Sequence, residues 1–178
     1  MTAAQLRVHL RDHFERAGVT AEPVTASVTF LGLQAIDVLR FGPDSDSVSH
    51  YVSVGGSRHV EGVPTEVLVS LRGKAVAEGL ARSVAVLAAA PAVEGLALTV
   101  DALVDLGQPL WRGAPFTAVL LADSDIAALG ELQFLRAVPI TPNEAAWVRL
   151  KGPDAMRQAW REDGVNLLDP SRSAARPR

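Results

Sequence analysis

Two histidines spaced four residues apart are the strongest chemical signal in the sequence. His9 and His13 fall within an expected helix, where positions i and i+4 share one face and can chelate a metal ion. In the zincin pattern a glutamate directly follows the first histidine, but Leu10 stands there instead. A third ligand would have to come from elsewhere in the chain, with His50, His59 and Asp12 as the options. The incomplete motif favours two polar residues beside an apolar stripe.

Three further segments carry weaker signals. Carboxylates two residues apart, as in Asp44–Asp46 and Asp123–Asp125, can hold Mg²⁺ or Ca²⁺, but both triplets follow apolar segments where turns are expected. Neither has the glycine and distal glutamate of an EF-hand loop. Gly55-Gly56-Ser57-Arg58 offers backbone N–H groups and an arginine to an anion, yet it lacks the spacing and lysine of a Walker loop. Turn and loop roles are therefore favoured.

The sequence offers no recognisable nucleophile with an adjacent base. It contains no cysteine, which excludes thiolate catalysis, disulfides and cysteine-based zinc sites. A serine or threonine nucleophile remains, but there is no G-x-S-x-G elbow. The four histidines are scattered and do not identify a general base. We therefore predict no catalytic residue, no resident metal and no cofactor.

The charge balance argues against a nucleic-acid partner. The 178 residues carry a net charge of −3, from 17 basic and 20 acidic side chains. Three of the arginines lie in Ser171–Arg178, so the rest of the chain has 14 basic and 20 acidic residues, a balance of −6. Such a body lacks the basic footprint of nucleic-acid binding. It would suit a basic protein partner through charge complementarity.

No segment has the pattern of a signal peptide or a membrane span. The N-terminal residues lack a continuous apolar run and include Arg7 and Arg11. The most apolar window, Ser83–Val100, is interrupted by Pro91 and Glu94, whereas a spanning helix needs about 20 apolar residues in a row. The content of 48% hydrophobic and 21% charged residues is that of an ordinary globular protein. We expect a cytoplasmic protein.

The first half of the chain predicts one amphipathic helix followed by short strands. Thr2–Ala17 should be a helix that is capped by Thr2 and ended by Gly18. Ala26–Phe41 is β-branched and aromatic but interrupted by a glycine, which indicates two short strands or one bent strand. The next expected strands are Tyr51–Val54 and Thr65–Leu71.

The middle of the chain predicts a helix and two extended segments. Lys74–Ala90 has apolar residues at helical spacing, and Pro91 should stop this helix. Leu96–Leu106 is expected to be extended. Ala114–Ala122 is apolar on both faces, which predicts a central strand.

The clearest local signal is a strand followed directly by a capped helix. Leu132–Ile140 is a run of bulky apolar residues typical of a buried strand, and Pro139 should end it or place it at an edge. Thr141-Pro142-Asn143-Glu144 then supplies the N-cap, the N1 proline and the N3 glutamate of a capping box. A final helix carries Met156 and Trp160 on one face.

The remaining features concern the domain boundary and the surface. Residues 1–170 contain no repeat and no linker, so they should form a single domain. Residues 171–178 lack an apolar anchor and are predicted to be a disordered basic tail. Trp111 follows a turn and is the tryptophan expected at the surface, next to Arg112. Because Trp and Arg are frequent at interface hot spots, both are candidates for partner contact.

Several segments resemble, in order, the suppressor of fused (SUFU) domain family over about residues 45–172. The matching segments are His50–Gly55, an aromatic strand before glycine; Thr65–Arg72, an apolar strand with glutamate that ends in arginine; Gly79–Val84, a helix opening; Leu132–Glu144, the strand and capped helix; and Asn166–Asp169 before Arg172. The sequence departs from the family at Glu61-Gly62-Val63-Pro64, where a glycine-rich aromatic approach is usual. The family's usual tryptophan and proline before the Leu80 helix are also missing.

The resemblance implies an α+β fold, with a mixed β-sheet covered by helices in a single SUFU-like domain, and no catalysis. In animal relatives the domain holds a transcription-factor peptide as an added strand. Bacterial relatives are often immunity proteins that neutralise secreted toxins. The resemblance covers one domain, so we do not expect the two-domain clamp of the animal proteins here. Strand addition needs an exposed sheet edge with side-chain pockets, for which Tyr51–Val54 and the loop Arg58–Glu66 are the candidates.

The sequence therefore predicts a non-enzymatic protein-binding module, with an immunity protein that neutralises a toxin as the more specific hypothesis. The expected partner is another protein, and neither nucleic acid nor a membrane. The expected partner-binding residues are Tyr51, Arg58, Glu61, Glu66, Trp111 and Arg112. One alternative is a metal-dependent hydrolase or small-molecule binder that uses His9 and His13. Another is a structural domain of a larger assembly, tethered by the basic tail.

Overall fold

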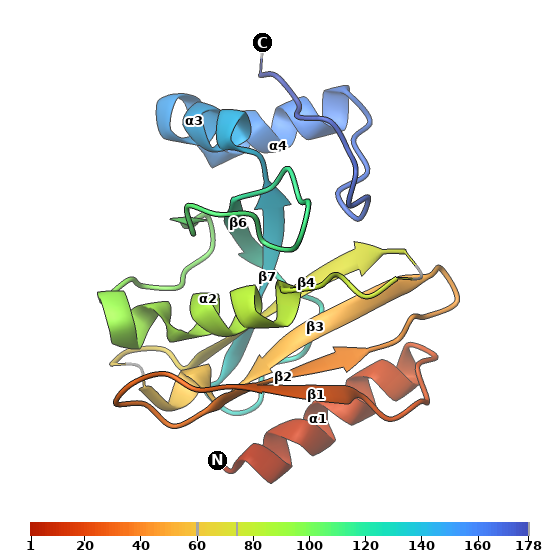
Figure 1. Cartoon of the computed structure of the whole chain (residues 1–178), viewed down its shortest axis with the longest axis vertical. Coiled ribbons are helices and arrows are strands. Elements are labelled where there is room, and N and C mark those ends of the chain that lie inside the picture. Colours follow the sequence, from red (N-terminus) through yellow and green to blue (C-terminus); the bar gives the residue numbers. More distant parts are fainter. Residues whose placement is uncertain (60, 74, 178) are drawn as a thin grey trace.

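A seven-stranded mixed β-sheet forms the centre of the protein in a computed structural model that describes residues 1–59, 61–73 and 75–177 (Figure 1). The strand order is β1-β2-β3-β4-β7-β6-β5. The strands are β1 Val24–Val28, β2 Ile36–Phe41, β3 Val48–Val54, β4 Thr65–Arg72, β5 Leu103–Asp105, β6 Ala118–Asp123 and β7 Gln133–Ile140. The helices are α1 Ala3–Arg16, α2 Leu80–Glu94, α3 Pro142–Lys151 and α4 Pro153–Glu162, with a 3₁₀ turn at Gly56–His59. The predicted α+β class, a mixed sheet covered by helices, is confirmed.

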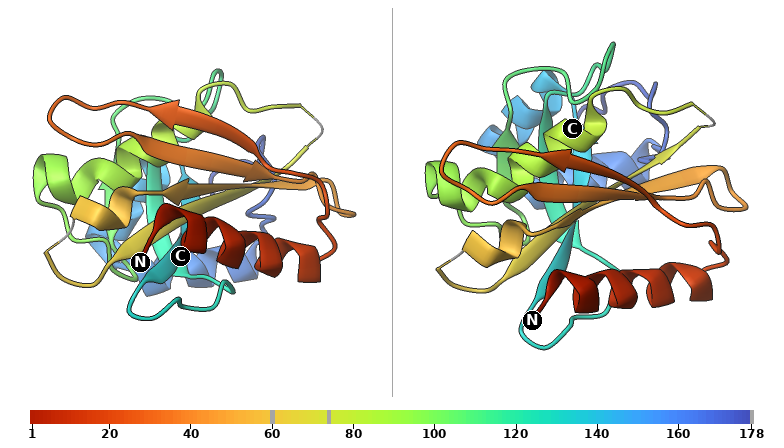
Figure 2. Two further views of the ribbon diagram at one scale, coloured as in Figure 1. Left: turned by 90° about the horizontal axis from the view of Figure 1, so that it is seen from below. Right: turned by 60° about the horizontal axis from the view of Figure 1, so that its bottom comes forward.

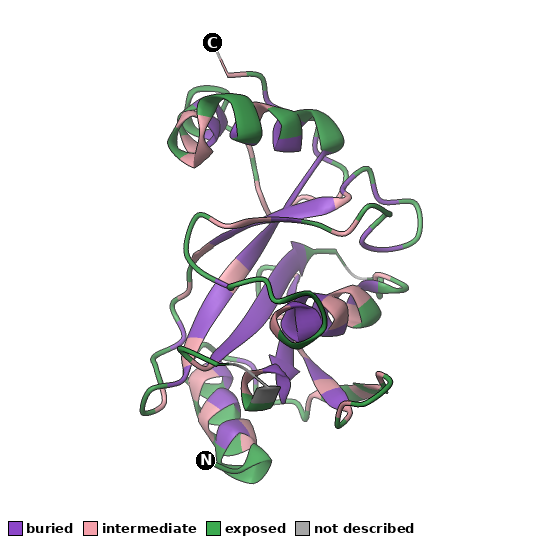
Figure 3. Ribbon diagram, turned by 90° about the vertical axis from the view of Figure 1, so that its left-hand side faces the viewer, coloured by how far each residue is buried: buried purple, intermediate pink, exposed green. Residues whose placement is uncertain are grey.

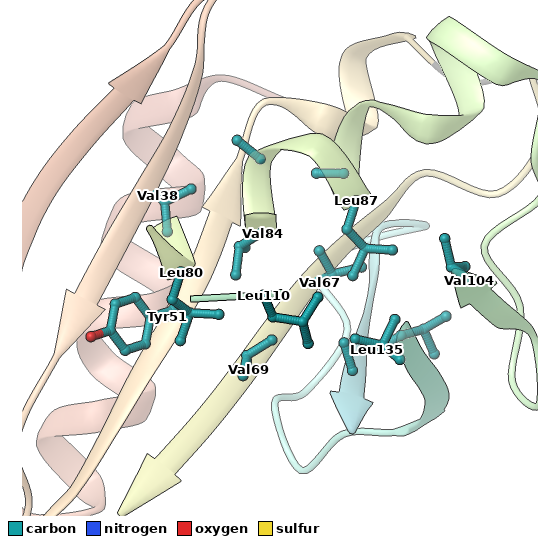
Figure 4. Packing of buried hydrophobic residues seen from close by; sticks show 14 of the residues in the cluster. Val38, Tyr51, Val67, Val69, Leu80, Val84, Leu87, Val104, Leu110 and Leu135 are labelled. Atoms are coloured by element: carbon teal, nitrogen blue, oxygen red, sulfur yellow. The ribbon is translucent and has the colours of Figure 1, made fainter. Parts of the chain in front are cut away.

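Helices α1 and α2 cover opposite faces of the sheet (Figure 2). Side chains alternate along β3, so Tyr51 belongs to the core beneath α2 while Val52 belongs to the core beneath α1. Leu80, Val84 and Leu87 of α2 pack into the first core (Figure 4). The central strands are buried on both sides, whereas the outer surface of α1 is exposed (Figure 3). A third cluster joins α3 and α4 to β6 and β7.

Two helices begin where the capping signals predict. Thr2 caps α1 in a capping box with Gln5, and Thr141 caps α3 in a capping box with Glu144. The interrupted segment 26–41 forms two strands, β1 and β2, joined by a hairpin loop. These local predictions are confirmed.

Helix α2 differs from its prediction at both ends. It begins at Leu80 and continues through Pro91 to Glu94, whereas the predicted first residue, Lys74, lies outside the described residues. Pro91 cannot donate the helical hydrogen bond to residue 87, and the helix continues for only three residues beyond it. Of the predicted extended segment 96–106, only β5 forms a strand, while residues 101, 102 and 106 add backbone hydrogen bonds to residues 117 and 121. In the described part of the chain, no helix is both long and apolar enough to cross a membrane.

The sheet opens into a fork between β4 and β7. These strands are parallel, and their ladder joins residues 65–68 to residues 133–136. Beyond the ladder the strands diverge (Figure 1), so residues 69–72 have a strand partner only on the β3 side. The prediction that Pro139 ends the strand or marks an edge is confirmed in its second form, because β7 has a strand partner only on the β6 side at this position. Pro139 pairs with Val119 of β6, and its carbonyl faces the fork, where a missing N–H breaks no ladder.

Residues 166–175, the C-terminal segment, fill the fork. Arg72 N donates to Leu168 O at 2.8 Å on the β4 side, and Arg172 Nη2 donates to Pro139 O at 2.8 Å on the β7 side. Ala175 is buried in the cluster of α3, α4, β6 and β7. The prediction of a disordered tail over 171–178 is therefore wrong for Arg172 and Ala175, while Arg178 lies outside the described residues.

An ion pair between Arg172 and Glu144 anchors this segment. Arg172 Nη1 lies 2.9 Å from Glu144 Oε2, and the two side chains are 4% and 0% exposed. Glu144 also accepts hydrogen bonds from Thr141 N at 3.0 Å, Trp160 Nε1 at 2.7 Å and Ala175 N at 3.2 Å. The lack of an apolar anchor in residues 171–178 suggests disorder, but a buried ion pair holds the segment in place. One carboxylate thus ties α3, α4 and the C-terminal segment together.

Stability should fall in acid because of Glu144. Burial alone would raise the pKa of this carboxyl, but hydrogen bonds from Arg172, Thr141 and Trp160 outweigh burial and lower its pKa. The unfolded chain therefore binds more protons in acid than the folded chain does. The stabilisation is complete above the unfolded pKa and is lost as the pH falls through the lowered folded pKa.

We expect the urea midpoint of the native chain to fall below about pH 4, because glutamate in unfolded chains titrates near there. Glu144→Gln cannot titrate, so its midpoint should change less with pH. The pKa values of Asp44, Asp105 and Asp169 are also lowered, so the urea midpoint of the variant should still fall somewhat in acid. Identical pH profiles for the two proteins would contradict the role of Glu144.

Candidate functional site

Three of the predicted contact residues meet in a hollow at the fork, on the face of the sheet that α2 covers. Tyr51, Trp111 and Arg112 line this hollow, which has a volume of about 390 Å³. We call it the α2-face hollow. Its other lining residues are Ser49, Leu71, Arg72, Gly73, Ala75, Val76, Ala77, Glu78 and Pro170. Strands β3 and β4, the residues before α2 and the C-terminal segment therefore build it together.

Two aromatic rings form the floor of the α2-face hollow. Tyr51 is 3% exposed, and its hydroxyl accepts a hydrogen bond from Ala77 N at 3.3 Å. Trp111 is 8% exposed, with its ring 5.4 Å from the ring of Phe116. The prediction that Trp111 lies at the surface is therefore wrong. Both rings shape the hollow from below and do not protrude from it.

The rim is polar and open to solvent. Arg112 N donates to Glu78 O at 2.8 Å, which fixes the rim loop against the residues before α2. The Arg112 and Glu78 side chains lie 3.5 Å apart but are 82% and 74% exposed, so their ion pair is weak and exchangeable. Val76 adds an exposed apolar side chain to the same rim.

Strand β3 is not the sheet edge that the sequence predicted. Residues 51–54 pair with β2 on one side or β4 on the other, within the interior of the sheet. The outer edges are β1 and β5. A further edge lies inside the fork: the ladder with β7 ends at Leu68 and Leu168 accepts only from Arg72 N, so residues 69–71 of β4 have no strand partner on that side. This internal edge adjoins the α2-face hollow, because Leu71 belongs to the edge and also lines the hollow.

The other predicted contact residues lie at the opposite end of β3 and β4. Glu66 is 0% exposed and accepts hydrogen bonds from Ser53 Oγ, from Gly55 N at 2.8 Å and from Ser57 N at 3.1 Å. It holds the loop that follows β3 from within. Arg58 donates to Ala35 O at 2.7 Å. Glu61 is exposed, and the predicted loop 58–66 also includes Val60, which lies outside the described residues.

A second hollow, on the α1 face, collects the residues that suggested metal chemistry. This α1-face hollow is lined by His13, His50 and the aspartates of both Asp-Ser-Asp triplets, with a volume of about 520 Å³. His9 lies elsewhere: its Nε2 is 2.7 Å from Ala127 O, and its ring stacks on Phe134. The described residues include no group of three His, Asp or Glu side chains arranged to hold a metal ion. The side chain of His59 lies outside them. The geometry thus does not support the metal hypothesis.

His50 links a serine to an aspartate within the α1-face hollow. His50 Nδ1 lies 2.7 Å from Ser70 Oγ, and His50 Nε2 lies 3.1 Å from Asp44 Oδ2. Burial raises the pKa of Asp44, but hydrogen bonds from Val48 N, His50 and Asp46 N outweigh burial and lower that pKa. Asp44 thus stays ionised. The ring nitrogens are exchanged relative to a serine-hydrolase triad, where Nε2 faces the serine. We infer that these Asp44–His50–Ser70 hydrogen bonds hold the turn before β3 against β4.

The sequence and the fold were compared with known proteins. A family model described as Suppressor of fused protein (SUFU) matches residues 32–173. A search of curated proteins finds no match. Among solved structures, a suppressor of fused homologue from Neisseria gonorrhoeae has a TM-score of 0.75 and 17% identity, with 94% of this chain and 92% of that chain covered.

Two further structures share the fold. The Sufu–Fu complex matches with a TM-score of 0.71 and 14% identity, with 97% of this chain and 91% of that chain covered. Drosophila Suppressor of Fused matches with a TM-score of 0.67 and 14% identity, with 96% of this chain covered. The match spans 50% of the Drosophila chain, so this chain corresponds to about half of it.

Proposed function

Because the chain belongs to the suppressor of fused (SUFU) family, we propose that it is a non-enzymatic protein-binding module whose partner docks in the α2-face hollow. The coincidence of three features carries this proposal: a stretch of β4 that has no strand partner on one side, an aromatic floor and an exposed arginine on the rim. Peptide recognition by strand addition needs these parts, since main-chain hydrogen bonds supply affinity and adjacent pockets supply specificity. The same fold is found in the Sufu–Fu complex.

We further propose that the partner is a toxin and that this chain acts in the cytoplasm as its immunity protein. The resemblance to bacterial single-domain relatives supports this role. In such a pair the immunity protein occludes the toxin surface, so a stable complex and relief of toxicity belong together. Co-expression with the product of the adjacent gene tests the role. If the cells stay sensitive and no complex forms, this partner is wrong.

Filling the α2-face hollow should abolish partner binding. Ala75 is exposed and lines the hollow, so Ala75→Trp can place an indole there at little cost to the core. We expect its affinity for the partner to fall by at least about tenfold, as for a blocked hot-spot pocket. Titration calorimetry on the purified pair measures the loss.

Ala128→Trp is the matched control, because Ala128 is exposed and does not line the hollow. This control should bind like the native chain. If Ala75→Trp also binds like the native chain, the partner docks elsewhere.

A further inference from the structure

We infer that the segment bound at the α2-face hollow is acidic and extended, and that Arg72, Arg82 and Arg112 bind its carboxylates. This inference rests on the proposed function, because it names the chemistry of the partner at the same site.

The α2-face hollow continues into a neighbouring hollow of about 400 Å³. The two share a wall formed by Glu78, Trp111 and Arg112. Arg72 lines the first hollow and Arg82, at the start of α2, lines the second. We call the two hollows together the arginine groove. The groove suits an extended segment, because its lining runs from the end of β4, where that strand has no partner on one side, to the start of α2.

The charge of the arginine groove is positive. Three arginines line it, whereas Glu78 is the one acidic residue among the lining residues described. Glu78 forms a weak, exposed pair with Arg112, so a partner carboxylate can replace it. Arg82 is exposed and forms no ion pair within the described residues. Asp169, near the rim, is engaged by Ser171 N and Oγ at 2.9 Å each.

The net charge of the chain suggested the opposite partner, a basic protein. The structure places a group of acidic side chains on the other face of this sheet: Asp44, Asp46, Asp123 and Asp125 line the α1-face hollow. Arg136 lines it with them, and Arg72 lines both hollows. Docking responds to the local field at the contact and less to the net charge. An acidic segment is therefore the complementary occupant of the arginine groove.

The residues of the groove also define how such a segment would bind. A guanidinium can hold a carboxylate through two parallel hydrogen bonds, which fixes orientation as well as charge. The arginines stand around the buried rings of Tyr51 and Trp111, so an apolar side chain between two acidic residues would lie on an aromatic floor. Main-chain pairing with residues 69–71 of β4 would keep the segment extended.

A random-peptide phage library selected on the immobilised full-length chain tests the inference. We expect enriched peptides to carry at least two acidic residues. A synthetic copy of the most enriched peptide should bind Arg82→Gln/Arg112→Gln at least about tenfold more weakly than the native chain, since two charge-assisted contacts are lost. Arg16→Gln/Arg161→Gln removes the same charge from exposed sites outside the groove and should leave affinity unchanged.

The other outcomes separate this inference from the proposed function. Neutral or basic peptides that lose binding only on Ala75→Trp would overturn the acidic partner and leave the docking site standing. Binding that neither Ala75→Trp nor the arginine variant affects would overturn both. A short oligodeoxythymidylate that binds as tightly as the peptide, and is lost with the same arginines, would identify a nucleic-acid groove and overturn the inference.

Discussion

Replacing Arg172 with alanine should lower the free energy of unfolding by about 3–5 kcal/mol, because it leaves the Glu144 carboxylate buried without its cation. The Glu144 side chain is 0% exposed, so water cannot replace the lost partner in the folded state. The guanidinium also lies 4.9 Å from the ring centroid of Phe116 and 5.7 Å from that of Trp160. Urea unfolding, with the slope of the transition checked for constancy, measures the change.

Arg161→Ala is the matched control for this prediction. Arg161 is an exposed arginine of α4, so its loss should change stability by no more than about 0.5 kcal/mol. If Arg172→Ala is as stable as this control, the C-terminal segment does not depend on the Arg172–Glu144 pair. A large loss would confirm that residues beyond 170 belong to the folded body.

Replacing Glu66 with alanine should destabilise the fold by about 2–4 kcal/mol, because it strips buried donors of their acceptor. Glu66 accepts from Gly55 N, Ser57 N and Ser57 Oγ at 2.7 to 3.1 Å, and from Ser53 Oγ. Each unsatisfied buried donor costs about 1–3 kcal/mol, and local relaxation recovers part of the sum. Thermal and urea unfolding both report the loss.

Glu61→Ala separates a structural role for Glu66 from a binding role. The sequence predicts both glutamates as partner contacts, but Glu61 is exposed while Glu66 is buried. Glu61→Ala should therefore keep native stability. The structural role of Glu66 is wrong if Glu66→Ala unfolds like the native chain and loses only partner binding.

Signals that act within a few residues were predictable from the sequence. The capping boxes at Thr2 and Thr141 identify the starts of α1 and α3, because each satisfies its own backbone donors locally. Strand β4 was equally clear, since its residues are buried on both faces of the sheet. The family was also recognisable, from motifs that recur in a fixed order.

Features that depend on distant partners were not predictable. The interior place of β3 follows from the order of strands across the sheet, which the alternation of its residues cannot reveal. Pro139 indicates that β7 either ends or becomes an edge, but which of the two holds depends on the fork. The sequence around Arg172 predicts a solvated tail. Its buried position depends on Glu144, which lies 28 positions earlier in the chain.

The candidate site shows the same division. Tyr51, Trp111 and Arg112 were chosen for residue type and do meet in one hollow, but reasoning from type alone also chose Glu66, which is buried. Arg72 and Arg82 were missed as contacts. Their signal was weak, because a strand-end arginine and a helix arginine become neighbours of one groove only when α2 packs on the sheet. The buried position of Trp111 likewise depends on Phe116 and α2.

The parallel ladder at the base of the fork also constrains how the molecule folds. Thr65 pairs with Gln133, 68 positions further along the chain, whereas β1 to β4 form a meander of sequence neighbours. Closing so long a loop costs chain entropy before its few residue pairs contribute stability. We expect the β1–β4 meander and the β6–β7 hairpin to form first. The β4–β7 ladder, which joins these two units, should form last. Until they join, the apolar surfaces of both halves stay open to other chains, which makes this late step the one most exposed to aggregation.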